Sequence, residues 1–150
     1  MKKFNFSLEK VLEVKEQILE NLKIELGNLN NNLINLNTAI ENLKGQFKDL
    51  EKEFNEKSST SISVGEMLYY KMLINNVLKQ IEISEEQKQM LLKKIEVKRQ
   101  EVVNMKMEIS SLEKLKEKEL VKYTKSVTRN EELFIEEFIS NKGLSKKYAI

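Results

Sequence analysis

The 150-residue sequence contains no proline, cysteine, histidine or tryptophan, and it has only four glycines. Proline and glycine interrupt regular structure, so their scarcity predicts long unbroken elements. The lack of cysteine excludes disulfides and thiolate zinc sites, and the lack of histidine removes the commonest general base and transition-metal ligand. We therefore expect a protein that is not an enzyme and that needs no cofactor or metal.

The chain also lacks a strong charge of either sign. Its 26 basic and 24 acidic residues leave a net charge of +2, so we expect no nucleic-acid partner. No apolar run approaches the roughly 20 residues that a bilayer span needs, and the start of the chain lacks the apolar region of a secretory signal. The sequence thus predicts a protein that stays in the cytoplasm.

An apolar heptad repeat dominates the first third of the chain. Its positions alternate in steps of four and three residues, and only one of them is not apolar. Over so many heptads this pattern indicates a coiled coil, and we predict a first helix over residues 4–57. The seam positions are Leu8, Leu12, Lys15, Leu19, Leu22, Leu26, Leu29, Leu33, Leu36, Ile40, Leu43, Phe47, Leu50 and Phe54.

A serine-rich segment over residues 58–65 predicts a chain reversal. Ser63 and Glu66 have the spacing of a capping box, which would open a second helix over residues 66–141. Gly143 predicts a left-handed helix stop, followed by a frayed tail over 142–150. The second seam is less regular than the first. It comprises Met67, Tyr70, Ile74, Val77, Ile81, Leu91, Ile95, Val102, Met105, Ile109 and Leu112, with Ser84, Lys88 and Lys98 on the same register.

One seam per helix and one short reversal predict an all-α fold, a single long antiparallel two-helix coiled-coil hairpin whose second helix is the longer. A turn centred near Ser61 would place residue 4 beside about residue 118. The second helix would then extend past its partner and leave an apolar stripe with little internal cover, which favours a partner-binding surface. Dimerisation through the same stripe is the alternative. The stripe comprises Tyr123, Val127, Phe134 and Phe138.

A second candidate surface lies just after the turn. The helix is apolar almost all the way round there, whereas a hairpin can bury only one face. Methionine suits adaptable interfaces and tyrosine is frequent at binding hot spots. The cluster therefore predicts either a partner-binding patch or a set of side chains that fold over to close the hairpin tip. Its members are Leu68, Tyr69, Met72 and Leu73.

Both ends of the chain resemble the FliJ family of flagellar export proteins. Residues 4–12, FNFSLEKVL, fit the F-x-F-x-L-x-x-V-L opening of that family. Residues 112–118 with the later Tyr123 and Glu131 are similar to its C-terminal region, where Glu136-Glu137 takes the place of the usual Asp-Glu pair. The chain length, the lack of cysteine and the longer second helix agree with the family as well.

This resemblance implies a non-catalytic component of the flagellar type III export apparatus, needed for flagellum biogenesis and motility. It implies a peripheral location at the inner face of the membrane, at the flagellar base. The partners implied are the ring of the export ATPase FliI, the cytoplasmic part of the export-gate protein FlhA, and export chaperones. The family hairpin is similar to the coiled coil of the rotary ATP synthase γ subunit, whose role is that of a stalk.

On this reading, the paired chain ends would enter the ATPase ring through Phe4 and Phe6 together with Tyr123, Val127, Phe134 and Phe138. Leu68, Tyr69, Met72 and Leu73 would face the gate. Two other classes remain open: a rotor subunit of a vacuolar-type ATPase and a holdase chaperone similar to prefoldin. A small-molecule substrate is not expected, because a two-helix hairpin has no concave site.

Overall fold

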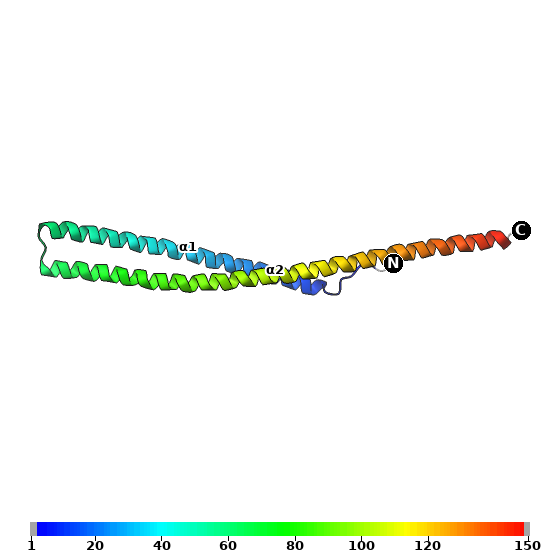
Figure 1. The fold of residues 1–150 in the computed structure, drawn as a ribbon, viewed down its shortest axis with the longest axis horizontal. Helices are drawn as coiled ribbons and strands as arrows, with labels where there is room; N and C mark the ends of the chain where they lie inside the picture. Colours follow the sequence, from blue (N-terminus) through cyan, green and yellow to red (C-terminus); the bar gives the residue numbers. More distant parts are fainter. Residues whose placement is uncertain (1–2, 149–150) are drawn as a thin grey trace. The chain divides into compact units, whose positions relative to one another are not determined.

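The structure is a computed structural model that describes residues 3–148. Its two helices are α1, Glu9–Thr60, and α2, Val64–Tyr148, joined by three residues (Figure 1). No strand occurs within the described range. The two helices pack against each other, and α2 is the longer at 85 residues against 52. This architecture confirms the predicted all-α fold with a longer second helix.

The packed residues form two compact units, each containing a segment of both helices. The first unit joins the described residues up to Leu19 with those from Asn104 onward, and the second unit spans Glu20–Val103. Every predicted seam position on both helices is buried or half-buried, so both heptad registers are confirmed. The most deeply buried side chains are Phe6, Leu12 and Ile109 in the first unit, and Ile40, Tyr70, Ile95 and Val102 in the second.

The beginning of α1 differs from the prediction, because the helix starts at Glu9 rather than at residue 4. The amide of Glu9 donates to the Phe6 carbonyl over 3.1 Å, and the first α-helical bond joins the Leu12 amide to the Leu8 carbonyl. Asn5 and Ser7 are weak helix formers, so packing of Phe4 and the buried Phe6 keeps this segment out of the helix. A non-helical chain rises about 3.3 Å per residue against 1.5 Å in a helix, so this segment reaches further along α2.

The reversal is shorter than the predicted residues 58–65, since only Ser61–Ser63 are non-helical. The hydroxyls of Ser59 and Thr60 donate to the carbonyls of Glu56 and Lys57, which satisfies acceptors at the end of α1 and lets the helix continue. Ser63 caps α2 as predicted, because its hydroxyl oxygen accepts the Glu66 amide over 3.1 Å.

The predicted helix stop at Gly143 is wrong. The second helix continues to Tyr148, and no described glycine has a positive φ. A glycine inside an exposed helix costs only about 1 kcal/mol relative to alanine, so Gly143 alone does not end a helix that the neighbouring residues favour. The predicted tail over 142–150 is helical as far as residue 148, and residues 149 and 150 lie outside the described residues.

Candidate functional site

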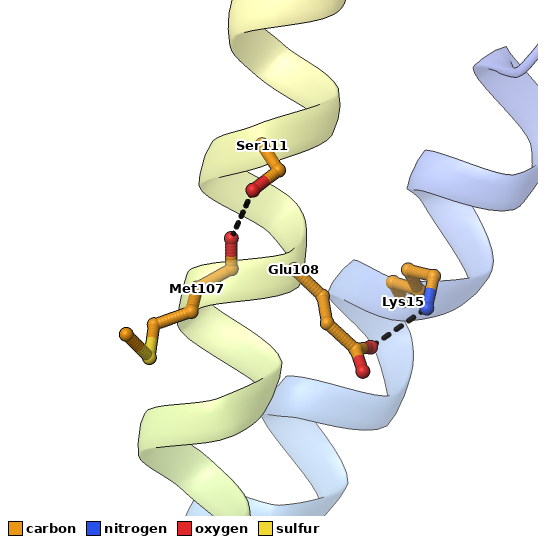
Figure 2. Close-up of polar contacts among 4 residues, drawn as sticks. All are labelled: Lys15, Met107, Glu108 and Ser111. Atoms are coloured by element: carbon orange, nitrogen blue, oxygen red, sulfur yellow. Dashed lines mark hydrogen bonds and ion pairs between the residues drawn. The ribbon is translucent and has the colours of Figure 1, made fainter.

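Two lysines on the seams, Lys15 and Lys98, pair with acidic residues of the facing helix. In the first unit the Lys15 ammonium lies 2.7 Å from a Glu108 carboxylate oxygen, and Figure 2 shows the two side chains meeting between α1 and α2. In the second unit Lys98 lies 2.7 Å from Glu25 and 3.0 Å from Glu101. A charged seam position with an opposite charge on the facing helix specifies register. These lysines therefore align the helices rather than form a site.

Pairing also changes the acid–base behaviour of Lys98. The Glu25 carboxylate, and next the Glu101 carboxylate, raise the pKa of Lys98 above its ordinary value by accepting hydrogen bonds from the ammonium. Each bond favours the charged form.

The N-terminal segment packs onto α2 at the position where the first helix no longer covers it. Phe6 is only 4% exposed, and the Phe4 ring lies 5.5 Å from the Tyr123 ring, tilted by 50°. The Lys116 ammonium lies 2.7 Å from a buried oxygen of Glu9, and this ion pair compensates the buried charge without an aligned hydrogen bond. Three contacts thus hold the segment in place.

Only part of the terminal stripe has the exposure that the sequence predicts. The stripe comprises Tyr123, Val127, Phe134 and Phe138. Phe134 is 70% exposed and Phe138 is 55% exposed, so both lack internal cover. Tyr123 and Val127 are half-buried. The expectation of little internal cover is wrong for Tyr123, because the non-helical segment carries Phe4 to it instead of ending near residue 118.

We call residues 124–143 the arm. From residue 128 to residue 143 every side chain is exposed, and the ribbon is coloured orange to red there (Figure 1). Sequence reasoning missed three exposed apolar residues of the arm because they lie off the heptad register. Reading Leu-Phe-Ile and Phe-Ile as local apolar runs would have found them. They are Leu133, Ile135 and Ile139.

The turn cluster, Leu68, Tyr69, Met72 and Leu73, begins one turn into α2. Leu68, Tyr69 and Met72 are exposed, while Leu73 is half-buried. The first three therefore do not fold over to close the hairpin tip.

Tyr70 closes that end of the second unit instead. Its hydroxyl donates to Glu53 over 3.0 Å, and its ring lies 5.9 Å from the Phe54 ring. The Lys57 ammonium lies 5.2 Å from the centre of the same ring, and interaction with the Tyr70 side chain raises the pKa of Lys57. Burial of Tyr70 leaves its neighbour Tyr69 pointing outward.

In the described part of the chain, no group of three or more acidic side chains is placed to hold a metal ion. Neither helix, over the residues described, contains a segment both long and apolar enough to cross a bilayer. Exposed apolar side chains make the terminal stripe and the turn cluster the candidate surfaces.

The chain matches a known protein family. The family model described as flagellar FliJ protein matches residues 4–147, which is nearly the whole chain. No curated protein matches the chain, and no solved structure matches it.

Proposed function

Because the chain belongs to the FliJ family of flagellar export proteins, we propose that it is a stalk-like adaptor that binds and stimulates the export ATPase ring and links it to the export gate. The family is non-catalytic, in agreement with the prediction that this chain is not an enzyme. The proposed location is the inner face of the membrane at the flagellar base, reached through partners.

The terminal stripe supports engagement of the ATPase ring. Phe134 and Phe138 are large, apolar and exposed, and they lie four residues apart on one side of the arm. Aromatic side chains of this kind supply most of the binding free energy where they enter a partner's pocket. Phe4 and Phe6 contribute by holding the N-terminal segment beside Tyr123 at the base of the arm, with Val127 completing the stripe.

The turn cluster supports contact with the gate. Leu68, Tyr69 and Met72 form an exposed apolar surface next to the half-buried Leu73, and the buried Tyr70 anchors the helix behind them. The proposed partner is the cytoplasmic part of FlhA. Export chaperones are proposed as a third class of partner, without a surface assigned to them.

The adaptor would act through differential binding. A stalk shifts the ATPase between its states only by as much as its contacts differ between those states. The apolar terminal stripe would thus favour the assembled ring over free subunits and one nucleotide state over another, while the chemistry of hydrolysis stays with the ATPase.

The test is a titration of the purified chain into its cognate export ATPase, following ATP hydrolysis and ring assembly together. The wild-type chain should stimulate both to saturation. Phe134→Ala with Phe138→Ala should raise the half-saturating concentration by at least about tenfold, since hot-spot aromatics contribute about 2 kcal/mol or more each. Ile24→Ala with Ile34→Ala is the matched control, because both isoleucines are 61% exposed on α1.

Unchanged stimulation by the phenylalanine variant would show that the terminal stripe does not contact the ATPase. No stimulation by the folded wild-type chain would reject the stalk role. For the gate, a variant carrying Leu68→Ala, Tyr69→Ala and Met72→Ala should lose binding to the cytoplasmic part of FlhA while it still stimulates the ATPase. Retained binding would reject the turn cluster as the gate surface.

A further inference from the structure

A second surface runs along the arm and the turn of α2 just before it, on the side opposite the seam. It begins at Val121 and continues through residues spaced by four, four, three, four and three, so that all of them share one helical face. All six side chains are exposed. We call this surface the outer face, and it comprises Val121, Lys125, Arg129, Glu132, Glu136 and Ile139.

The order of residues on the outer face is self-complementary. Around a midpoint between residues 130 and 131, Arg129 and Glu132 are equidistant, and so are Lys125 and Glu136. The position as far before the midpoint as Ile139 lies after it is residue 122, which is next to Val121. Read from the N-terminal end, the face runs apolar, cationic, cationic, anionic, anionic, apolar. A half-turn about the midpoint therefore brings each cation opposite an anion.

The charges around the outer face follow the same division. Within the outer face and the residues between its members, residues 121–129 contain three basic and no acidic residue, a net charge of +3, whereas residues 130–140 contain four glutamates and no basic residue, a net charge of −4. Two arms overlapping in parallel would place like charges against each other. Antiparallel overlap places the basic half of each copy against the acidic half of the other.

The four charged residues of the outer face have no ion pair within residues 3–143, in contrast to the paired Lys15, Lys98 and Lys116. Within the helix, Lys125 and Arg129 are like-charged neighbours four residues apart, as are Glu132 and Glu136, while Arg129 also lies three residues from the oppositely charged Glu132. Each such like-charged pair destabilises a helix by about 0.2–0.5 kcal/mol. An opposite charge on a facing helix would offset that repulsion.

The arm also needs a packing partner for its own stability. Isolated helices are marginal in water, and most helical stability in proteins comes from tertiary packing. Yet no side chain from residue 128 to residue 143 is covered. Near the outer face, the hydroxyls of Thr124 and Thr128 already donate to the carbonyls of Leu120 and Thr124, so these positions need no polar partner.

We propose that a second copy of this chain packs antiparallel on the outer face of the arm, with Arg129 facing Glu132 and Lys125 facing Glu136 of the other copy. Val121 and Ile139 of the two copies meet at either end of the overlap. The overlap spans about 20 residues, or roughly 30 Å at the helical rise. This self-association goes beyond the proposed adaptor role, and it leaves Phe134 and Phe138 on the uncovered side.

Sedimentation equilibrium of the full chain tests the proposal. The wild-type mass should rise with concentration from 17.7 kDa towards twice that value. A variant carrying Lys125→Glu with Arg129→Glu, and another carrying Glu132→Lys with Glu136→Lys, should each remain monomeric. An equimolar mixture of the two should associate at least about tenfold more tightly than either alone, because the two reversals restore opposite charges across the interface.

The matched control is Lys114→Glu with Lys118→Glu. It makes the same change of charge on exposed lysines of the same helix, four residues apart, but outside the proposed overlap. This control should dimerise like the wild type. Far-UV circular dichroism of every variant establishes that its helices are intact. A wild-type chain that stays monomeric up to about 1 mM would overturn the proposal, as would a mixture of the two reversed variants that fails to associate.

Cysteine cross-linking fixes the orientation independently, since the chain has no cysteine of its own. Under oxidation, Val121→Cys mixed with Ile139→Cys should give a disulfide-linked heterodimer, and Val121→Cys alone should give almost none. Efficient linking of Val121→Cys to itself, without the heterodimer, would mean parallel packing and would overturn the proposal.

Discussion

At the scale of single residues, two of the polar positions on the seams, Lys15 and Lys98, are explained by acidic partners on the facing helix. Lys15 meets Glu108, and Lys98 meets both Glu25 and Glu101. A lysine stem packs along an apolar seam while its ammonium reaches the edge, so the seam loses little burial there. Tyr70 combines the same roles, because its ring is buried while its hydroxyl reaches Glu53.

The raised pKa of Lys98 predicts loss of stability in strongly alkaline solution. A group whose folded pKa is raised stabilises the fold while it is protonated. This contribution is complete below the ordinary value of 10.5 and disappears as the pH rises through the raised value. Compared with a Lys98→Met variant, the wild type should show a constant difference in melting temperature from about pH 7 to 9. The wild type should then lose stability relative to the variant above 10.5. A difference that stays constant through that upper range would contradict the assignment.

The Tyr70 hydroxyl should contribute measurably to stability. Tyr70→Phe keeps the ring contacts with Phe54 and Lys57 but removes the hydrogen bond to Glu53. We expect urea denaturation to show a loss of about 1 kcal/mol, typical of one intramolecular hydrogen bond. Tyr69→Phe is the control, since Tyr69 is 56% exposed, and it should change stability by less than about 0.5 kcal/mol. Equal effects of the two substitutions would assign no role to the Glu53 contact.

At the scale of elements, the ends of the helices depend on which backbone groups find partners. Ser63 caps α2, and the hydroxyls of Ser59 and Thr60 extend α1 into a serine-rich stretch whose composition favours a turn. At the other end of α1, packing of Phe6 and Phe4 outweighs continuation of the helix. Local propensity therefore decides the reversal only in part.

The helical conformation of Gly143 can be tested by substitution. A methyl group added there meets no atom within 4 Å, and the φ angle is not positive. Gly143→Ala should therefore increase helix content by far-UV circular dichroism and stabilise the end of the arm by up to about 1 kcal/mol. If Gly143 were a left-handed cap, alanine would be strained and helix content would fall instead. Gly27→Ala, also inside a helix with open space around it, is the control for a helical glycine.

At the scale of the whole molecule, burial differs sharply along the chain. Seam residues such as Ile40 and Ile95 are 3% exposed, whereas the arm has no covered side chain after Val127. Local opening costs least where few apolar contacts must be broken. The arm should therefore be the least stable helical segment of the isolated monomer.

Hydrogen exchange followed by mass spectrometry should reveal this gradient. At low protein concentration, amides of residues 128–143 should exchange fastest among the helical residues, and those around Ile40 and Ile95 slowest, because only the latter lie behind a packed seam. Protection of the arm that rises with protein concentration is expected if the second copy covers the outer face. Uniform protection along both helices at low concentration would contradict the exposure of the arm.

The sequence by itself determined the helical class, both seam registers, the cap at Ser63 and the family. A heptad repeat can be recognised in the sequence because every seventh residue returns to nearly the same face of the helix. The spacing of the apolar residues therefore identifies the buried positions. The exposure of Phe134, Phe138 and most of the turn cluster follows from the same reasoning, since a hairpin buries only one face of each helix.

Only the tertiary structure decided where α1 begins, that Phe4 covers Tyr123, which acidic residues pair with the seam lysines, and that α2 continues past Gly143. Each of these depends on contacts between residues far apart in the chain, or on a balance of about 1 kcal/mol between a weak local preference and its neighbours. The periodicity of the sequence does not predict such contacts or such small differences in free energy. It gives the face on which a residue lies, whereas the partner on that face is set by the fold.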